Sequence, residues 1–334
     1  MFNEKVGRAI SFLRKRAGLT QMDLAIRLGV TDKAVSKWER GLGVPDISII
    51  SRLSVILDTD TDSLLAGDVI NHSNKWVGLL ILNGNVPVSE KIIDKPLIYF
   101  MMSYFLLVGI RIINVCCNDK DKEYIESNSA LWDTLGICIS FNKLVEFENN
   151  NNHNAMIVIG NIFVYGVDLT KFLKKGMAYD DRPIVLSLPK RIDSGKVVHF
   201  NDNMRIIDVE NDEVLNTQYD YYELPIFFVP QRYLKSVLQS VGFISGNSNV
   251  TFFTSCLDRG FVELYANNYE ELEELKSFVN IVQKACGMQI YCIEEIAWRR
   301  GFIDMNTLKK LGVNQNDSIY GRYILRLVSD NKEK

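Results

Sequence analysis

The segment from residue 18 to residue 41 constrains the fold of this chain more than any other stretch. It reads GLTQMDLAIRLGVTDKAVSKWERG, with apolar residues at helical spacing on both sides of Gly29. Thr20 and Thr31 each precede one apolar run, and a threonine side-chain oxygen can cap a helix by accepting a backbone N–H. Two short capped helices joined by a glycine-containing turn predict a helix-turn-helix.

Polar residues of the second helix gather on a face that its apolar residues leave free. They are Asp32, Lys33, Ser36 and Lys37. A helix face of this kind can enter the major groove of DNA. The alternative is an ordinary helical hairpin with a solvated face, but the caps, the turn and the polar face together favour the helix-turn-helix.

Four stretches from Lys5 onward resemble the Cro/XRE family of helix-turn-helix DNA-binding domains. They are RKRAGLTQMDLA, LGVTDKAVSKWERG, PDISIISRLSVIL and DTDSLLAGD. The resemblance implies an all-α, five-helix domain in residues 1–68, whose third helix reads base edges while Gln21 contacts backbone phosphate. The DNA-contacting residues predicted in this way are Gln21, Thr31, Asp32, Lys33, Ser36 and Lys37.

The distribution of charge agrees with such a module. Residues 1–40 contain nine basic residues against four acidic ones, whereas the whole chain of 334 residues carries a net charge of -3. A basic head is therefore followed by an acidic remainder. The net charge alone argues against general nucleic-acid affinity, but a basic head on an acidic body suits a phosphate-contacting domain joined to an effector domain.

Six cysteines occur without a CxxC pair or another metal-ligand spacing, and the chain has three histidines. We therefore expect no metal site and no cofactor, and interpret the cysteines as small apolar core residues in a reducing cytoplasm. No signal-peptide pattern opens the sequence. The most apolar run, Pro96 to Ile113, contains Ser103 and Arg111, which favours a buried helix and strand over a membrane span.

The remainder of the chain predicts a short polar linker, residues 69–75, followed by an α/β domain in residues 76–330. Trp76 to Asn83 is a continuous apolar run, which is typical of a central parallel strand buried on both faces. Helical and strand patterns then alternate, which indicates βαβ units and a mixed, mostly parallel sheet. The asparagine-rich run from Asn149 to Asn154 predicts a polar loop.

Several stretches of this second domain resemble glucose-1-phosphate thymidylyltransferases, the family that makes dTDP-glucose. They are DKPLIYFMMSYFLLVGIRIINV, GNIF followed by YG, NDNMR, and CIEEIAWRRGFID followed by YGRYIL. The last match is the longest and most specific, and an accidental α/β domain would not produce it. The resemblance implies a Rossmann-like nucleotidyltransferase fold and a homo-oligomer.

The groups that nucleotidyl transfer needs are missing from the matching positions. After Leu82 the sequence reads NGNVP, without the arginine of the family's GGxGTRL phosphate loop. The first Mg²⁺-binding aspartate is either deleted or replaced by Asn161, and Tyr265 stands at the position of the second. The family's sugar-phosphate lysine aligns with Asp212, and the base-binding segment has no counterpart. The resemblance therefore implies a catalytically inactive relative without a bound metal.

Several enzymes of this family carry a second nucleotide site at a subunit interface, built from the segment after GDNIF and from the xEEIAWR run. The matching residues are Tyr165, Gly166, Cys292, Glu295, Ile296 and Arg299. Glu295 and Arg299 are four apart on one helix face, so they either bind a nucleotide or form a plain ion pair. The same run is alternatively retained purely for packing.

The sequence thus predicts a DNA-binding transcriptional regulator whose inactive nucleotidyltransferase-like domain serves for oligomerisation and effector sensing. Two alternatives stay open: an active thymidylyltransferase with a DNA-binding head, and a structural dimeriser without a ligand. The expected partners are double-stranded DNA, a second copy of the chain, and a thymidine nucleotide or nucleotide sugar. We expect a cytoplasmic protein without membrane contact.

Overall fold

The computed structural model describes residues 2–330, except for residues 17–18, 58, 60, 67–75, 83, 167, 180, 190–195, 201–205, 212–220, 246–249, 251 and 257–260. The chain separates into two compact units, with the main boundary between Lys75 and Trp76. The predicted linker, residues 69–75, lies outside the described residues.

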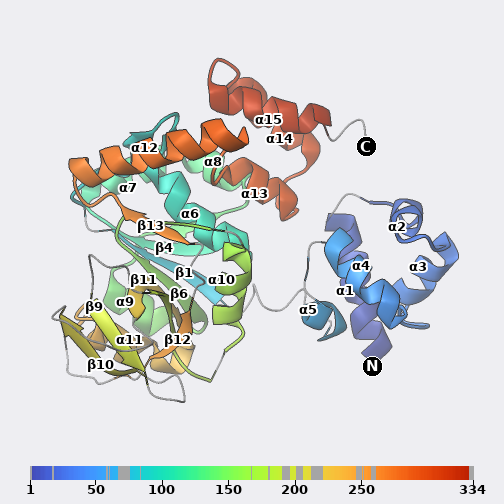
Figure 1. Ribbon diagram of the computed structural model, residues 1–334, viewed down its shortest axis with the longest axis horizontal. Coiled ribbons are helices and arrows are strands. Elements are labelled where there is room, and N and C mark those ends of the chain that lie inside the picture. Colours follow the sequence, from blue (N-terminus) through green and yellow to red (C-terminus); the bar gives the residue numbers. More distant parts are fainter. Residues whose placement is uncertain are drawn as a thin grey trace. The chain divides into compact units, whose positions relative to one another are not determined.

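The first unit is helical, and its helices share one apolar core. They are α1 (Phe2–Arg16), α2 (Gln21–Leu28), α3 (Asp32–Glu39), α4 (Ile47–Ile56) and α5 (Thr61–Ala66) (Figure 1). Each helix contributes a fully buried residue to this core: Leu13, Leu24, Val35, Leu53 and Leu64. The prediction of a five-helix domain is confirmed over the residues that the structure describes.

Both predicted helix caps are present. The hydroxyl of Thr20 accepts the N–H of Asp23 at 3.1 Å, and the Asp23 carboxylate accepts the N–H of Thr20 at 2.8 Å, which completes a capping box. Gly29 ends α2 with a φ of 70°, a left-handed conformation that glycine adopts without strain. The hydroxyl of Thr31 caps α3 by accepting the N–H of Ala34 at 3.2 Å.

A glycine in the middle of α1 allows α3 to cross close to it. A Cβ atom added to Gly7 would lie 2.2 Å from the carbonyl oxygen of Trp38, which is a backbone atom near the end of α3. Because a backbone carbonyl cannot move aside as a flexible side chain can, the close crossing of the two helices depends on this glycine.

The second unit is built around a nine-stranded mixed sheet (Figure 1). Its strands are β1 (Trp76–Ile81), β4 (Ile112–Cys116), β5 (Cys138–Ser140), β6 (Asn154–Ile159), β8 (Ile184–Pro189), β9 (Lys196–Phe200), β10 (Ile206–Asn211), β11 (Tyr221–Val229) and β12 (Phe253–Cys256). Strand β1 pairs in parallel with β4 on one side and β6 on the other, and β4 pairs in parallel with β5. Strand β11 joins β6 in the antiparallel direction. The predicted central parallel strand and mixed sheet are therefore confirmed.

Two short antiparallel pairs are the other strands among the described residues of this unit. One consists of β7 (Ile162–Tyr165) and β13 (Val262–Tyr265), and the other of β2 (Lys91–Ile92) and β3 (Lys95–Pro96). The helices before residue 180 are α6 (Leu97–Val108), α7 (Asp119–Ser127), α8 (Ser129–Thr134), α9 (Leu144–Asn150) and α10 (Leu169–Met177). Those after it are η3 (Gln231–Tyr233), α11 (Leu234–Ser240), α12 (Tyr269–Cys286), α13 (Ile293–Arg299), α14 (Met305–Asn314) and α15 (Ile319–Asp330).

Helices cover both faces of β1, which explains why its sequence is apolar throughout. Val77 and Leu79 point to the face that Phe147 of α9 and Val237 of α11 cover. Gly78 points to the other face, where the ring of Phe105 from α6 would lie 2.8 Å from an added Cβ. All six residues of β1 are buried. A strand covered on both faces needs apolar residues at every position rather than at alternate ones.

Helix α9 is a departure from the prediction. It extends through Asn150, and β6 begins at Asn154, so the predicted polar loop from Asn149 to Asn154 is reduced to residues 151–153. The buried ring of Phe147 anchors this helix on the sheet. Tertiary packing thus carries the helix into asparagines that locally favour turns.

Among the described residues, no helix combines the length and apolarity that crossing a membrane requires.

Replacing Gly7 by alanine is expected to destabilise the first unit. Alanine favours a helix interior over glycine by about 1 kcal/mol, but forcing an atom into a packed site costs about 1–3 kcal/mol. The cost of the clash should exceed the gain in helix propensity, because the clash involves the backbone of α3. Amide hydrogen exchange in α1 and α3 of the full chain should accelerate. Gly43→Ala is the control, because its added Cβ would meet Lys37 Cε at an ordinary 3.4 Å. Equal exchange in both variants would contradict the prediction.

Candidate functional site

The outward side of α3 carries most of the residues that the sequence predicts to contact DNA. Val35 and Trp38 anchor the helix in the core. On the other side, Lys33 and Lys37 are exposed, and Asp32 and Ser36 are partly exposed. The Asp32 carboxylate accepts the N–H of Lys33 at 2.8 Å. The folded domain therefore presents two exposed lysines on one helix, and an ammonium group can donate to guanine in a major groove.

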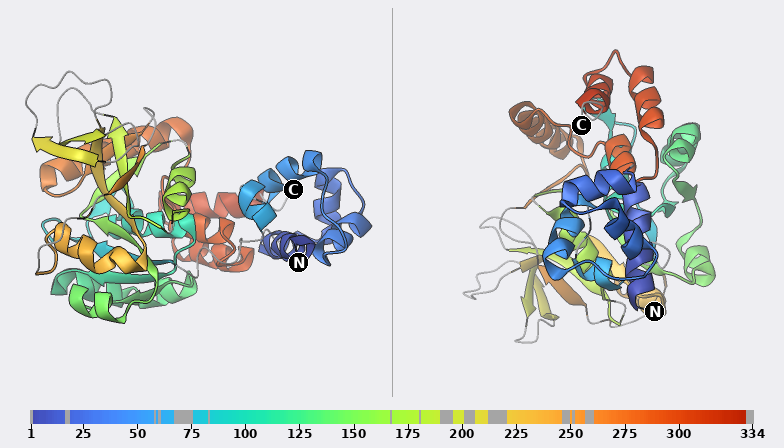
Figure 2. Two further views of the ribbon diagram at one scale, coloured as in Figure 1. Left: turned by 90° about the horizontal axis from the view of Figure 1, so that it is seen from below. Right: turned by 90° about the vertical axis from the view of Figure 1, so that its right-hand side faces the viewer.

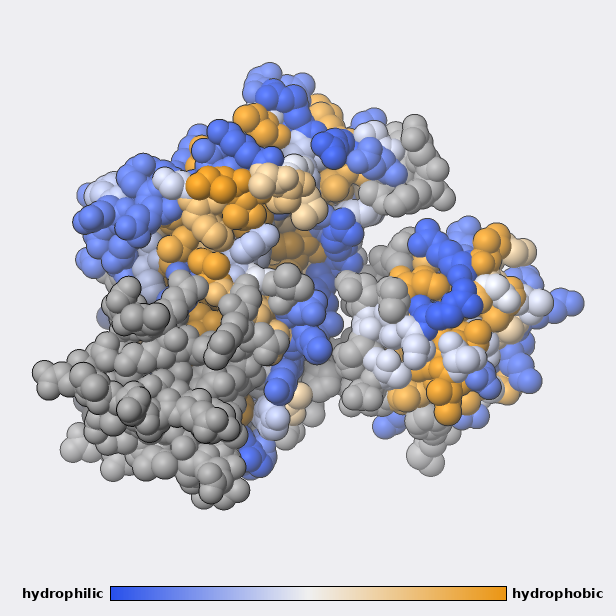
Figure 3. Space-filling model, viewed as in Figure 1, coloured by the Kyte–Doolittle hydropathy of each residue, from blue (hydrophilic) through white to orange (hydrophobic). Residues whose placement is uncertain are grey.

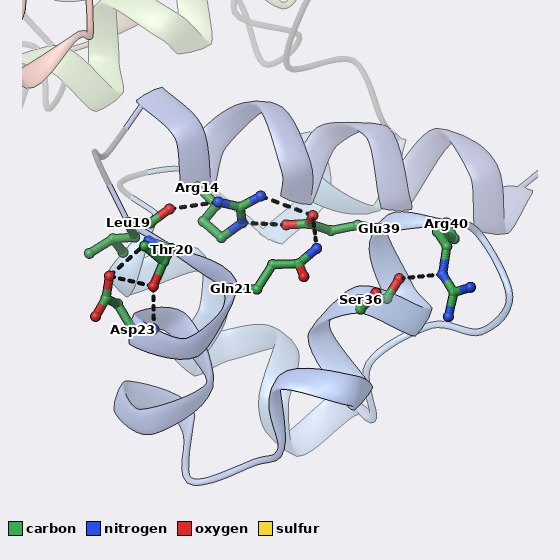
Figure 4. A network of polar contacts seen from close by, with 8 residues as sticks. All are labelled: Arg14, Leu19, Thr20, Gln21, Asp23, Ser36, Glu39 and Arg40. Atoms are coloured by element: carbon green, nitrogen blue, oxygen red, sulfur yellow. Dashed lines mark hydrogen bonds and ion pairs between the residues drawn. The ribbon is translucent and has the colours of Figure 1, made fainter.

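Gln21 takes part in a polar network inside the head (Figure 4). Its amide Nε2 donates to Glu39 Oε2 over 2.8 Å. Arg14 donates to the two oxygens of Glu39 through Nε at 2.5 Å and Nη2 at 3.0 Å, and through Nη1 to the carbonyl of Leu19 at 2.6 Å. The contact between Gln21 and phosphate stays a prediction. The start of α2 adds the backbone N–H groups that helix N-termini offer to phosphate.

The Arg14–Glu39 pair fixes the recognition helix against the rest of the head. The side chains of Arg14 and Glu39 are 10% and 7% exposed. Burial opposes ionisation of Glu39, but hydrogen bonds from Arg14 and Gln21 outweigh it and hold the pKa of this carboxyl below its usual value. The charged pair therefore persists at neutral pH and joins α1, the start of α2 and the end of α3.

In the second unit, two short segments form the sheet edge at which α/β proteins bind ligands. They are the loop after β1 and the residues after β6. Open α/β sheets bind ligands beyond the carboxyl ends of the strands where the strand order reverses. Here the chain adds β4 and β5 on one side of β1 and then returns to add β6 on the other. The backbone of Gly160, after β6, donates to the carbonyl of Ile81 at 2.7 Å.

The structure brings together the two positions at which the sequence places the missing aspartates. Tyr265 of β13 pairs with Ile162 of β7, and Ala266 N donates to Asn161 O at 2.9 Å. The side-chain Nδ2 of Asn161 donates to the carbonyls of Ala266 at 3.1 Å and Val86 at 3.2 Å. Asn161 is 1% exposed. It works as a buried donor that ties three backbone segments together.

The shortened loop after β1 is folded onto this edge. Val86 and Val88 are fully buried. The backbone N–H of Val88 donates to Asp121 Oδ1 at 3.0 Å. Gly84 has a φ of 73°, and an added Cβ would lie 2.7 Å from the Asn118 amide nitrogen. The loop backbone is thus bonded to the protein itself at Val86 and Val88, whereas a phosphate loop turns its N–H groups toward a ligand.

Tyr265 does not replace the missing carboxylate chemically. Burial, together with the nearby carboxylates of Glu263 and Glu271, raises the pKa of its phenol to about 12, so the group is neutral at physiological pH. Within the described part of the chain, no group of three or more histidine, cysteine, aspartate and glutamate side chains is arranged to hold a metal ion. Asp212 lies outside the described residues.

The two segments of the predicted effector site meet, because Tyr291, just before α13, donates its hydroxyl to the carbonyl of Val164 in β7. Gly166 is covered by the ring of Phe261, which would lie 2.3 Å from an added Cβ. Tyr165 packs edge-on against Phe278 of α12 with ring centroids 5.8 Å apart. These contacts place Tyr165 and Gly166 in packed surroundings.

The other predicted effector residues belong to α13 and the residue before it. Cys292 is buried, Ile296 is partly buried and Arg299 is exposed. The carboxylate of Glu295 accepts the hydroxyl of Tyr323 from α15 at 2.6 Å. Nucleotide binding by these residues stays a prediction.

Sequence reasoning missed a buried polar cluster beside them. Lys95 and Glu294 are both 0% exposed. Lys95 Nζ donates to the carbonyl of Ile290 and lies 5.2 Å from the ring centroid of Tyr320. The Tyr320 hydroxyl donates to Glu294, as does Gln315 Nε2 at 3.3 Å. The sequence does contain a signal for this cluster. Three stretches that carry the resemblance each supply one of its charged or phenolic residues: DKP, IEEIAW and YGRYIL.

The cluster predicts a pH dependence of stability. Burial lowers the pKa of Lys95 from 10.5 to about 8, and nearby acidic groups partly offset this effect. Between these values the unfolded chain keeps a proton that the folded chain has released, so stability contributed by this group rises with pH. From pH 8 to pH 10, wild type should gain roughly 2 kcal/mol of unfolding free energy relative to Lys95→Met. Urea titrations at both pH values measure this difference, and parallel pH profiles would refute the prediction.

Comparisons with known proteins found similarities to two kinds of protein. The Helix-turn-helix family model matches residues 10–64. Glucose-1-phosphate thymidylyltransferase of Neisseria meningitidis is 28% identical over 258 residues, which cover 70% of this chain and 89% of that relative. The enzyme of Neisseria gonorrhoeae is 25% identical, with 70% and 89% covered. A solved Bacillus anthracis structure described as a glucose-1-phosphate thymidylyltransferase has a TM-score of 0.48, with 12% identity, 61% of this chain covered and 94% of that one.

The chain therefore combines an N-terminal helix-turn-helix domain with a C-terminal region that is similar to glucose-1-phosphate thymidylyltransferases.

Proposed function

We propose that this protein is a DNA-binding transcriptional regulator whose second unit transfers no nucleotides. The outward polar side of α3, held by the buried Arg14–Glu39 pair, is the observation that carries the regulatory role. A helix fixed in this way can enter a major groove without reordering of the domain, so little conformational entropy is lost on binding. One such helix reads few base pairs, and useful specificity therefore needs two half-sites and a self-associated chain.

The proposal of inactivity rests on the chemistry at the sheet edge. Nucleotidyl transfer needs carboxylates that hold Mg²⁺ and a loop that cradles phosphate. At the corresponding edge, the Asn161 amide donates to two carbonyls, and the loop beneath it buries Val86 and Val88. The alternative function is an active thymidylyltransferase with a DNA-binding head, which the sequence similarity to such enzymes favours.

Self-association is assigned to the second unit, because the head is small. Exposed apolar residues occur there on α12 and α15, with Ile281 66% and Ile319 62% exposed. Figure 3 shows hydrophobic residues among hydrophilic ones around α12 on its visible face. We further propose a thymidine nucleotide or nucleotide sugar as the effector, bound near Glu295 and Arg299, where the arginine would take a phosphate.

The lysines of α3 should control specific DNA binding. Lys33→Ala and Lys37→Ala should each weaken binding to a sequence selected from random DNA by about 1–3 kcal/mol, because each removes a donor to a base edge. Lys15→Ala, which removes an exposed charge from α1, is the matched control and should weaken binding to all DNA slightly and equally. Gel-shift titrations at fixed salt provide the measurement. Wild-type specificity in both α3 variants would rule out this assignment.

The second unit should release no pyrophosphate from dTTP and glucose-1-phosphate with Mg²⁺ beyond a buffer control. Asn161→Asp should not create activity, because it places a carboxylate against the carbonyls of Val86 and Ala266. Each carbonyl left without its donor costs about 1–3 kcal/mol. The variant should therefore unfold at lower urea than wild type, whereas Asn152→Asp, at an exposed position, should not. Mg²⁺-dependent pyrophosphate release by wild type would establish the alternative function instead.

A further inference from the structure

Helices α14 and α15 form a tightly closed hairpin. Figures 1 and 2 show them side by side, with α13 next to them. A Cβ added to Gly312 of α14 would lie 2.9 Å from Ile324 Cγ2 of α15. A Cβ added to Gly321 would lie 1.9 Å from the carbonyl oxygen of Gln315, at the end of α14. Glycine at these two positions lets the helices and their connection pack without space between them.

Polar bonds join α13 to this hairpin. Glu294 accepts from Gln315 and Tyr320, which stand at the two ends of the connection between α14 and α15. Glu295 accepts from Tyr323, one turn further along α15. These bonds join α13 to the hairpin of α14 and α15, and we name the three helices together the C-terminal arm.

The arm meets the rest of the second unit through buried charge. The ammonium of Lys95 lies over the ring of Tyr320, and its charge also interacts with that of Glu294. Both charged residues are fully buried. Taking a charged group out of water is costly, and attraction to a partner offsets this cost only in part.

The backbone is strained where the C-terminal arm leaves the rest of the second unit, which we call the body. Tyr291 has a φ of 51°, in the left-handed region that bulky residues rarely adopt. Its hydroxyl is bonded to Val164, and its ring packs against Tyr104 with centroids 5.7 Å apart, so Tyr291 itself is fixed to the body. Ile93, two residues before Lys95, is also left-handed, with a φ of 65°. Backbone strain therefore flanks both sides of the Lys95–Ile290 bond.

We propose that the C-terminal arm opens from the body as one unit while the sheet stays folded. Tyr291 and Cys292 form the joint, and the contact between Lys95 and Tyr320 is the latch. This opening is a property of the fold and does not rest on the proposed function. Opening exposes the thiol of Cys292, which is 2% exposed in the closed state, and so gives a direct chemical readout.

The first test is native-state alkylation of the full chain with iodoacetamide, followed at Cys292 by peptide mass spectrometry. Hydrogen exchange of the slowest-exchanging backbone amides in β1 and β6 is measured in parallel, because it reports global unfolding. Opening of the arm should occur at least about tenfold more often than global unfolding. Alkylation of Cys292 that occurs only as often as the sheet unfolds would overturn the proposal.

The second test concerns the latch. Lys95→Ala removes the bond to the carbonyl of Ile290 and the contact with the ring of Tyr320, and it should speed the alkylation of Cys292 about tenfold or more, with the exchange of β1 and β6 unchanged. Tyr320→Leu removes the ring from the arm side and should act in the same direction, which covers a failure of the first variant to fold. Lys276→Ala is the matched control, because this lysine of α12 pairs with Glu273 on the surface. Equal alkylation in wild type and both latch variants would show that Lys95 and Tyr320 do not hold the arm.

Discussion

The buried contact of Lys95, Tyr320 and Glu294 is the constraint on which the C-terminal part of the second unit depends. The three residues come from β3, α15 and α13, far apart in the sequence. An ammonium buried in apolar surroundings needs acceptors and an aromatic face, and a buried carboxylate needs donors. Each residue supplies what another requires, so removing one of them leaves a buried polar group without its partner, which typically costs about 1–3 kcal/mol.

The mutual dependence of Lys95, Tyr320 and Glu294 gives a physical reason for the similarity to thymidylyltransferases. This reason does not involve catalysis. The DKP, IEEIAW and YGRYIL stretches meet at the cluster, and their residues are used for folding. The positions that the resemblance assigns to catalysis lie elsewhere, at the carboxyl edge of β1 and β6. A chain can therefore lose the chemistry of that edge while packing alone retains the resemblance. Retention of the IEEIAW run is consequently weak support for an effector site, since Glu294 and Tyr320 already explain part of it.

Most of the fold was predictable from the sequence, because the strongest signals are local. The Thr20 and Thr31 caps, the Gly29 turn and the fully apolar β1 each follow from neighbouring residues. The polar networks were not predictable, because they join residues distant in the chain. The resemblance predicts a phosphate contact for Gln21, and the structure adds a bond from its amide nitrogen to Glu39, eighteen positions away. The full length of helix α9 was not predictable for the same reason, since the contact of Phe147 with the sheet anchors this helix.

The edge of the sheet shows why a metal site is hard to build at Asn161. A catalytic edge needs acceptors that stay uncovered, so that a cation and phosphates can reach them. A structural edge needs the opposite, namely donors that satisfy its backbone carbonyls and exclude water. The Asn161 amide meets the second demand for Val86 and Ala266 at once. A carboxylate at that position would repel the carbonyls that the amide now binds. Building a metal site there would therefore require the loop after β1 to leave the edge as well, at the cost of exposing Val86 and Val88, which no single substitution achieves.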